Sequence, residues 1–549
     1  PFPWRGDSPY ASILSSANKY YTHFGSHFAE FDPAKGDFTF LQETMPQMAM
    51  MMTEDDAGRI WSATYPNCGL VCFDPSSRQL TDYGYLNKEN WAQYPRYLAA
   101  DSAGWVYIGV GSTNAQIIAF DPATKKAFPV LQPAERAHGY GELFRGVDGK
   151  VYGRAPTSKE WFALFRGERT PVGESVKVAA KQYIAGSQGL SHRSFPDGRK
   201  LKSIDLERRA LVVTSADGKQ DKEVKFDYTS EGAHVMAVAA APNGTVCGGT
   251  AFPFYFFSYD PKTDKWINVP CFGQWNTVAR LGDKFYVGGY GGGFLLEWDP
   301  AKPWVPTQPD KADSNPRFLT EAEPDINRPH DLLACPDGRT LVLAGTPGYG
   351  YTGGGLLIWD TQAGTSTLLK HTELLEWQST MSLTAIGDGL IVGGTTIAAG
   401  TGGEVKAQQP ELYIFDLTQK KIVWHEPVLG AVGSYTDLCT GPDGLVYGFA
   451  GGRIFFVFDP KRRQVIHQKD VGSTLGSCSG GQGPRVFVKT PDGRIFVLMG
   501  KGFAQLDTGS FELTMVAEAP GGITVGGDYL DGRIYYVSGS HICSWKVPG

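Results

Sequence analysis

Two short motifs recur along the whole chain, and this recurrence limits the fold more than any other feature of the sequence. The first is Asp-Gly or Asn-Gly followed by a short β-rich run, which begins at Asp148, Asp197, Asn243, Asp337, Asp388, Asp443, Asp492 and Asp531. The second is an aromatic residue followed by Asp-Pro, with its carboxylate at Asp32, Asp74, Asp121, Asp260, Asp299 and Asp459. Together with looser copies they define about twelve units with a period of roughly 40 to 55 residues.

Each unit is predicted to contain four antiparallel strands. Asp-Gly and Asn-Gly favour two-residue hairpins, because both central positions of a type I′ turn require a positive φ. The aromatic-Asp-Pro motif closes the following strand and starts another turn, where Asp caps the backbone. A four-stranded unit with this period is typical of a β-propeller blade, so the fold class predicted is all-β, with about twelve blades.

Twelve blades exceed the usual four to eight of one ring, which favours two tandem propellers. The longest stretch without a β pattern is 303–329, rich in Pro, Asp and Asn. We therefore expect a first propeller over 1–306, a linker over 307–327 and a second propeller over 328–549, about seven blades plus five. The last unit has room for three strands, so the N-terminal segment is a candidate to complete it. One very large ring stays an alternative.

Composition excludes several classes of protein. With 42% hydrophobic residues, 20% charged residues, 69 Gly and 35 Pro, the chain is a turn-rich folded protein. A formal net charge of -6 provides no field for nucleic acid, and no apolar run is long enough to predict a membrane span. The eight cysteines are too scattered for a zinc site. The chain starts at Pro1, without Met or a leader, which fits a processed form and favours a secreted or periplasmic location.

Strict catalytic motifs are missing, so position in the repeat supplies the candidate site. In a propeller, the loops before each innermost strand and those joining the second and third strands gather on one face. The candidates for chemistry at these places are His138, His192, His234, His330, Arg96, Arg193, Arg328 and Tyr140. The candidates for contacting substrate are Trp91, Tyr94, Tyr97, Trp275, Asn276, Tyr349, Tyr351 and Trp377. Arg328 is expected to face the loop 345–355. A single His at such a place is more often structural, satisfying backbone groups.

His, Tyr and Arg together suit β-elimination from a uronic acid. Arg neutralises the substrate carboxylate, a neutral His or Tyr takes the adjacent proton, and a Tyr or His protonates the leaving oxygen. This chemistry requires no cofactor. Hydrolysis would instead need two carboxylates at the channel, for which Glu231, Asp331 and Asp437 are the candidates. No metal site is assigned, and a structural Ca²⁺ held by Asp-rich turns stays open.

The repeats and the His, Arg and Tyr positions resemble those of β-propeller carbohydrate-active enzymes, such as ulvan lyases and rhamnose-glucuronate lyases with their related rhamnosidases. The resemblance covers the repeat architecture of the whole chain. It implies a polysaccharide lyase acting on a uronic-acid-containing carbohydrate. The implied base is His138, His192, His234 or His330, and the implied carboxylate neutraliser is Arg96, Arg193 or Arg328. A glycoside hydrolase and a non-catalytic binding propeller are the alternatives.

Overall fold

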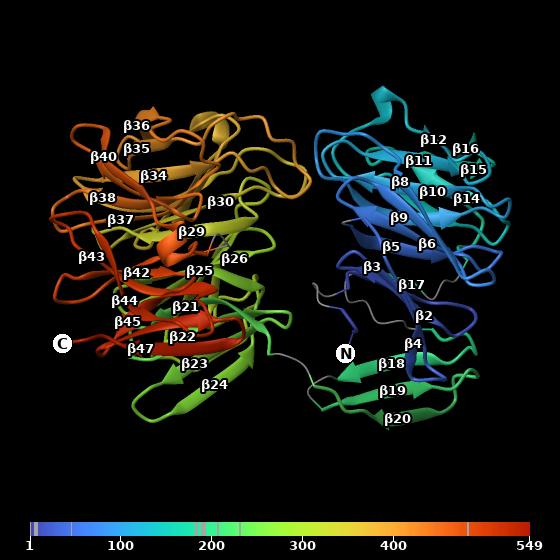
Figure 1. Ribbon diagram of the computed structural model, residues 1–549, viewed down its shortest axis with the longest axis horizontal. Coiled ribbons are helices and arrows are strands. Elements are labelled where there is room, and N and C mark those ends of the chain that lie inside the picture. Colours follow the sequence, from blue (N-terminus) through green and yellow to red (C-terminus); the bar gives the residue numbers. More distant parts are fainter. Residues whose placement is uncertain are drawn as a thin grey trace. The chain divides into compact units, whose positions relative to one another are not determined.

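The computed structural model describes residues 2–4, 9–45, 47–181, 185–187, 194–205, 208–229, 232–479 and 483–549. Among these residues, twelve antiparallel sheets follow one another along the chain (Figure 1). Nine of these sheets have four strands, one has five and two have three. The predicted all-β fold made of repeated, blade-like four-stranded sheets is therefore confirmed.

The chain divides into two compact units, and the first comprises Pro1–Ser230 with Thr401–Glu404. Its five sheets contain β17(Ala185–Ser187), β1(Ala11–Leu14), β2(Tyr20–Phe24), β3(His27–Asp32) and β4(Asp37–Glu43); β5(Met48–Glu54), β6(Ile60–Tyr65), β7(Gly69–Asp74) and β8(Gln79–Tyr85); β9(Tyr94–Ala100), β10(Val106–Gly111), β11(Gln116–Asp121) and β12(Lys126–Pro129); β13(Glu142–Arg145), β14(Val151–Arg154), β15(Trp161–Phe165) and β16(Glu168–Gly173); and β18(Lys200–Asp205), β19(Ala210–Thr214) and β20(Asp221–Lys225). A 3₁₀ turn spans Pro133–Glu135. We call this part the five-sheet unit.

The second unit comprises Glu231–Gly400 with Val405–Gly549. Its seven sheets contain β21(His234–Ala240), β22(Val246–Ala251), β23(Tyr255–Asp260) and β24(Lys265–Pro270); β25(Gln274–Leu281), β26(Lys284–Tyr290), β27(Phe294–Trp298) and β28(Arg317–Thr320); β29(Arg328–Ala334), β30(Thr340–Thr346), β31(Leu356–Asp360) and β32(Thr365–Leu369); β33(Ser379–Gly387), β34(Leu390–Thr396), β35(Leu412–Asp416) and β36(Lys421–Glu426); β37(Tyr435–Thr440), β38(Val446–Ala450), β39(Ile454–Asp459) and β40(Gln464–Asp470); β41(Phe487–Lys489), β42(Ile495–Met499), β43(Gly502–Leu506) and β44(Leu513–Glu518); and β45(Val525–Leu530), β46(Arg533–Ser538) and β47(His541–Lys546). Helix α1(Gly472–Leu475) and a 3₁₀ turn at His371–Glu373 lie between sheets. We call this part the seven-sheet unit.

The division differs from the expected domains 1–306 and 328–549, because the expected linker 307–327 belongs to a sheet. Strand β28 lies inside it and pairs with β27. The buried amide of Asn315 accepts a hydrogen bond from the backbone N–H of Asp299 at 2.9 Å and donates one to the Asp299 carbonyl at 2.9 Å. The Pro-rich composition of this segment thus reflects a long connection to an outer strand of the seven-sheet unit.

The described N-terminal residues 2–4 do not complete the last sheet. Trp4 donates a hydrogen bond from its indole N–H to the carbonyl of Phe24, in β2, at 3.2 Å. The rings of Phe2 and Trp4 also pack against Phe38 in β4. The last sheet keeps three strands, β45 to β47, among the described residues. The expected closure through the N-terminus is therefore corrected, because these aromatic residues pack their rings on the first sheet instead.

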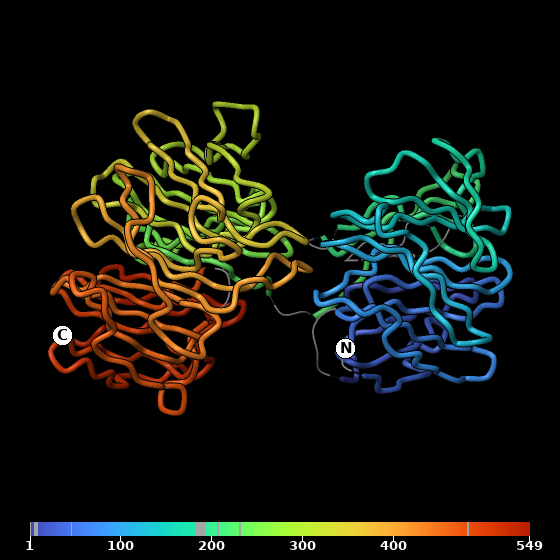
Figure 2. Tube along the Cα trace, turned by 90° about the horizontal axis from the view of Figure 1, so that it is seen from above, coloured from blue at the N-terminus to red at the C-terminus, as the bar shows by residue number. Residues whose placement is uncertain are grey.

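In the seven-sheet unit, the innermost strand of each sheet contacts the innermost strand of the next. The contacts run from β21 through β25, β29, β33, β37, β41 and β45, and β45 in turn contacts β21. Apolar packing closes the same path, since Val238 and Phe257 of the first sheet lie in one buried cluster with Tyr535 and Val537 of the last. Figure 2 shows this succession of sheets from green through yellow and orange to red. The sheets of this unit thus form a closed series of contacts.

The Asp-Gly motifs join two antiparallel strands, as predicted, but most of them are not two-residue type I′ turns. Both central residues have a positive φ at Asp388-Gly389 and at Asp531-Gly532. At Asp443-Gly444 the positive φ belongs to the glycine, and the Asp side chain accepts a hydrogen bond from the Leu445 N–H at 3.1 Å. The same carboxylate accepts the hydroxyl hydrogen of the buried Tyr447 at 2.6 Å. Asp therefore recurs in these longer turns because its side chain caps the turn and satisfies a buried phenol on the next strand.

This pairing predicts the effect of removing one carboxylate. Asp443→Ala should lower the free energy of unfolding of the seven-sheet unit by about 1–3 kcal/mol, because the Tyr447 hydroxyl is left buried without its acceptor. In a Tyr447→Phe background the same substitution should cost clearly less. Chemical denaturation of the four proteins measures this coupling, and equal costs in both backgrounds would contradict it.

Candidate functional site

Three side chains of the seven-sheet unit meet at the edge where its innermost strands begin. Tyr290 ends β26, Arg328 begins β29, and Tyr349 lies in the loop between β30 and β31. The hydroxyls of Tyr290 and Tyr349 are hydrogen-bonded at 2.7 Å, and Arg328 donates from Nη2 to the Tyr349 hydroxyl at 3.2 Å. We call these residues the Arg328 cluster. The expectation that Arg328 faces the loop 345–355 is confirmed, whereas the sequence analysis did not include Tyr290.

The Arg328 cluster places a permanent cation against two phenol rings. The guanidinium carbon of Arg328 lies 5.0 Å from the ring centre of Tyr290 and 5.1 Å from that of Tyr349, within the range of cation–π attraction. Burial, and then the hydrogen bond with Tyr349, raises the pKa of Tyr290 to about 12. Tyr290 therefore keeps its proton at neutral pH. The cluster can attract an anion and donate protons to it.

His330 lies two residues further along β29 and is 9% exposed. Its Nε2 is within hydrogen-bond distance of the Thr346 hydroxyl, at 3.2 Å, and its Nδ1 has no hydrogen-bond partner among the described residues. Burial, and then the charge of Arg328, lowers the pKa of His330 to about 4, so the imidazole is neutral at pH 7. If the proton resides on Nε2 and is donated to Thr346, Nδ1 is a proton acceptor.

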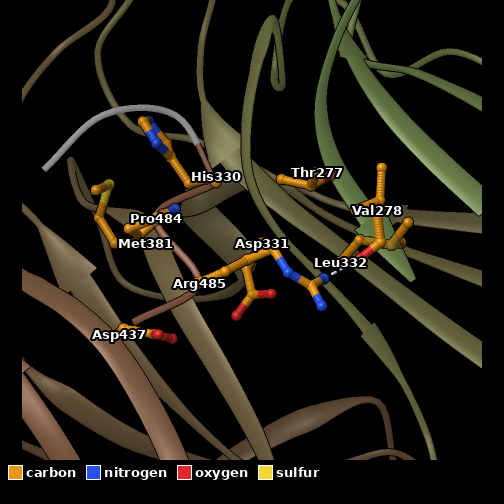
Figure 3. A pocket seen from close by; sticks show the side chains of 10 residues that line it. Thr277, Val278, His330, Asp331, Leu332, Met381, Asp437, Pro484 and Arg485 are labelled. Atoms are coloured by element: carbon orange, nitrogen blue, oxygen red, sulfur yellow. Dashed lines mark hydrogen bonds between the residues drawn. The ribbon is translucent and has the colours of Figure 1, made fainter. Parts of the chain in front are cut away.

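A small cavity of about 30 Å³ lies among the innermost strands of the same unit (Figure 3). Figure 3 shows Asp331 beside the side chain of Arg485, with Asp437 close to both. The lining residues are Thr277, Val278, His330, Asp331, Leu332, Met381, Asp437, Gly483, Pro484 and Arg485. A cavity of this size holds one or two water molecules. A sugar ring does not fit in it.

The carboxylates of this cavity tie neighbouring sheets together. Asp331 in β29 accepts a hydrogen bond from the Leu383 N–H in β33 at 2.7 Å. Asp437 in β37 accepts one from the Val486 N–H, next to β41, at 2.5 Å. The same relation recurs where Asp528 in β45 accepts from the Ala240 N–H in β21, at 3.1 Å. Each of the three Asp residues directly follows a β-bulge in its strand. This regular placement indicates a structural role.

The segment 483–485 crosses the inner end of the strands and narrows the cavity. Arg485 donates from Nη1 to the Val278 carbonyl in β25 at 2.6 Å. The Pro484 carbonyl accepts a hydrogen bond from the Gly526 N–H in β45 at 3.0 Å. A Cβ on Gly483 would lie 2.1 Å from the Asn276 carbonyl oxygen, so this position requires glycine. The segment therefore links β25 and β45, which are separated by β21 in the closed series of contacts. Its position across the unit explains why the central cavity is small.

A second cluster lies in the five-sheet unit. The Arg96 guanidinium carbon is 5.1 Å from the ring centre of Tyr94, 5.5 Å from that of Tyr10 and 5.8 Å from that of Tyr140. Arg96 also donates a hydrogen bond from Nη1 to the Tyr10 hydroxyl. We call these four residues the Arg96 cluster. The sequence analysis had selected Arg96, Tyr94 and Tyr140. It did not select Tyr10, which directly precedes β1, because neither repeat motif occurs there.

Several candidates for substrate contact are core residues. Trp275 is fully buried, and its ring packs against Phe256 at 5.2 Å, so it cannot stack on a ligand. Asn276 is fully buried as well and donates to the Pro329 carbonyl. Trp91 is also buried. These three assignments are corrected, because burial within the unit leaves each side chain out of reach of a ligand.

The remaining candidates are dispersed. Tyr351 is exposed, and Trp377 is half-buried with the Lys406 ammonium 4.1 Å from its ring centre. Tyr97 is half-buried, and burial raises its pKa. His138 in the five-sheet unit and His234 in the seven-sheet unit are exposed. The candidates His192, Arg193 and Glu231 lie outside the described residues.

No group of three or more His, Cys, Asp or Glu side chains within the described ranges is arranged to hold a metal ion. In the same part of the chain, all eight cysteines are unpaired. None of the described helices has the length and apolar character needed to cross a membrane.

Comparisons with known proteins return neither a matching family model nor a matching curated protein. Among solved structures, two of the extracellular domain of BT4673 from B. thetaiotaomicron are similar, one described as part of a one-component system and the other as part of a hybrid two-component system. Both share 10% identity and a TM-score of 0.39 with this chain, and they cover 99% and 100% of it and 71% of their own length. At this level of similarity no residue correspondence follows.

The cavity carboxylates predict a dependence of stability on pH. Burial, and then the charge of Asp437, raises the pKa of Asp331 to about 7, and burial raises that of Asp437 to about 6. A folded state that holds these protons more tightly than the unfolded chain loses stability as the pH rises from about 4 to 7. Asp331→Asn keeps an oxygen acceptor for Leu383 and should flatten this loss. Thermal unfolding across that range should show a smaller decline in Tm, at roughly 2–4 °C for each kcal/mol recovered.

Asp283→Asn is the matched control, since Asp283 has 85% of its side chain exposed in the same unit. It should leave the pH profile unchanged. A steeper decline for Asp331→Asn than for the unmodified protein would contradict the raised pKa.

Proposed function

We propose that the protein binds a uronic-acid-containing poly- or oligosaccharide on its seven-sheet unit and cleaves it by β-elimination. The Arg328 cluster carries this proposal, because its guanidinium contacts two phenol rings and donates to one of their hydroxyls. A cation beside two phenol hydroxyls can hold the substrate carboxylate and protonate a leaving oxygen. His330, on the same strand, supplies a neutral imidazole.

The proposal includes a propeller fold for each unit. The closed series of contacts among the seven innermost strands supports a seven-bladed propeller, whose loops gather at the edge that carries the Arg328 cluster. For the first unit, the five successive sheets, three of which have four strands, support five blades. We therefore propose two tandem propellers of five and seven blades.

In the proposed reaction, Arg328 pairs with the substrate carboxylate and acidifies the C–H bond beside it. His330 takes that proton at Nδ1 through a water molecule in the cavity that it lines, and the electron pair of the C–H bond forms the C4–C5 double bond as the C4–O bond breaks. The leaving oxygen takes a proton from the Tyr349 hydroxyl, to which Tyr290 is hydrogen-bonded. The proton on His330 returns to the phenols through solvent. The step consumes no cofactor or co-reactant.

The cavity carboxylates favour elimination over hydrolysis at this unit. Asp331 and Asp437 are the one pair of hydrolase candidates brought together among the described residues. Each accepts backbone N–H groups of the next sheet, and the space between them holds water but no sugar. Hydrolysis and non-catalytic binding are the alternatives that the assay below separates. Because the proposed substrate is a polysaccharide, we propose a secreted or periplasmic location.

The first test is the ultraviolet absorbance of an unsaturated product, measured with a panel of uronate-containing polysaccharides. Arg328→Ala should lower kcat/KM by about 100-fold or more, since the carboxylate loses its counter-charge. Tyr349→Phe should lower kcat about 10- to 100-fold with a smaller change in KM. The matched control is Arg317→Ala, because Arg317 lies on the outer strand β28 and is exposed. New reducing ends without unsaturation would indicate a hydrolase. The absence of product from every substrate would contradict the proposal that the protein is an enzyme.

A second test separates chemistry from binding. His330→Ala should reduce kcat by about 100-fold or more while the substrate Kd stays within a few-fold, because His330 takes a proton and does not hold the carboxylate. Isothermal titration calorimetry measures the Kd. Full activity of the variant would remove His330 as the base.

A further inference from the structure

We propose that the ring of Phe252 forms a second subsite of the seven-sheet unit, on which a sugar residue of the same saccharide stacks a few residues away from the cleaved bond. This subsite rests on the proposed function for its class of ligand. It belongs to another sheet of the unit and takes no part in the proposed reaction. Its consequence is a preference for long saccharide chains over short ones.

Phe252 lies at the edge of the first sheet where the innermost strand begins. It directly follows β22, whose last residue pairs with His234, the first residue of β21. Strand β21 contacts β25, and β25 contacts β29, which begins with Arg328. The second strands of these three sheets thus carry an aromatic residue at or just after their end, namely Phe252, Tyr290 and Tyr349. The Arg328 cluster and Phe252 therefore share one edge of the unit.

One intervening sheet separates Phe252 from Arg328 in the series of contacts. Packed sheets lie about 10 Å apart, so the separation of the two side chains is on the order of 20 Å. A chain of several sugar residues spans such a separation, whereas a disaccharide is too short to do so. A long saccharide can therefore contact both places, and a short one only the Arg328 cluster.

Folding alone gives little reason for a phenylalanine at position 252. Phe252 is 71% exposed, more than any other large apolar side chain that the structure describes. Its backbone φ of 51° lies in the left-handed region, which is costly for a bulky residue. Exposure of the ring and this backbone conformation both disfavour the folded state. Residues held in such conformations are typical of ligand sites.

The loop that carries Phe252 is fixed by contacts with its neighbours. The Thr250 hydroxyl donates a hydrogen bond to the Pro253 carbonyl at 2.8 Å and accepts one from the Tyr255 N–H at 3.2 Å. The ring centre of Phe254 lies 5.0 Å from that of Phe252, with the ring planes at 46°. The exposed ring is thus presented from an ordered hairpin loop. Such pre-organisation lowers the entropy cost of binding.

An exposed phenyl ring suits the apolar face of a sugar. The C–H groups of that face carry a small positive charge and pack on the electron-rich face of an aromatic ring. His234 is exposed at the start of the neighbouring strand, and its ring nitrogens can form hydrogen bonds with sugar hydroxyls. These contacts do not involve the carboxylate of the sugar. The subsite therefore binds a sugar residue without cleaving the chain there.

The experiment is a calorimetric titration of the full chain carrying His330→Ala, with di- and hexasaccharides of galacturonate, glucuronate, mannuronate and guluronate. With the sugar that binds most tightly, Phe252→Asn should weaken hexasaccharide binding about 10- to 100-fold, as expected for losing the burial of one phenyl ring. The disaccharide Kd should stay within a few-fold. Phe252→Tyr, which keeps the ring, should bind the hexasaccharide as before. The matched control is Trp266→Ala, because Trp266 is 53% exposed on the outer strand β24 of the same sheet.

Thermal unfolding separates a role in binding from a role in the fold. Phe252→Asn should keep or raise the Tm, because Asn adopts a positive φ at lower cost than Phe. A lower Tm with unchanged hexasaccharide affinity would assign the ring to the fold and overturn the inference. Phe252→Leu keeps an apolar side chain without an aromatic face and should also bind the hexasaccharide weakly. Full affinity in this variant would contradict stacking.

The outcomes distinguish this subsite from the proposed function. Unchanged hexasaccharide binding by Phe252→Asn, with both lengths weakened by Arg328→Ala, would overturn the inference and keep the proposed function. Weaker hexasaccharide binding by Phe252→Asn, with no effect of Arg328→Ala, would support the subsite and contradict the proposed place of cleavage. Equal weakening of both lengths by Phe252→Asn would contradict a separate subsite. No binding of any oligosaccharide would overturn both.

Discussion

Burial of both faces of most of the sheets is the constraint on which the rest of the structure depends. The middle strands β10 and β11 are buried almost throughout, on both faces, so a single sheet cannot cover its own apolar surface. Neighbouring sheets supply the cover, as where Ile414 of β35 and Phe456 of β39 lie in one buried cluster. In the seven-sheet unit this requirement continues around all seven sheets until the last packs on the first.

Polar groups then fix the geometry that apolar packing leaves free. Asp443 caps its turn and satisfies the buried Tyr447, while Asp331 and Asp437 link one innermost strand to the next sheet. The raised pKa values of the latter two show that burial costs these carboxylates part of their ionisation. They lie at the centre of the unit, where the segment 483–485 leaves a cavity for water. The centre of the unit therefore has no room for a ligand as large as a sugar.

Much of the fold follows from the sequence because its repeats act locally. An Asp-Gly motif needs only its own hairpin to form, and Asp in the aromatic-Asp-Pro motif caps a backbone N–H two residues away, as Asp74 does for Ser76. The site follows less well. Arg328 and Tyr349 share one sheet and were predicted to face each other. Tyr290 belongs to the preceding sheet, and Tyr10 reaches Arg96 across an intervening sheet, so no local pattern indicates either contact. For Trp275, position in the repeat predicted a ligand contact at the open edge, but its ring is buried in the core.

The sequence by itself determined the all-β class, the number of repeated units and the four-stranded form of most of them, because turn chemistry and strand propensity depend on neighbours in the chain. Tertiary structure decided how the twelve sheets divide between the units, since that depends on which sheet covers the last exposed face. It also decided that the segment 307–327 is an outer connection and that the Arg328 and Arg96 clusters form in separate units. Those outcomes depend on packing between residues far apart in sequence, which periodicity does not encode.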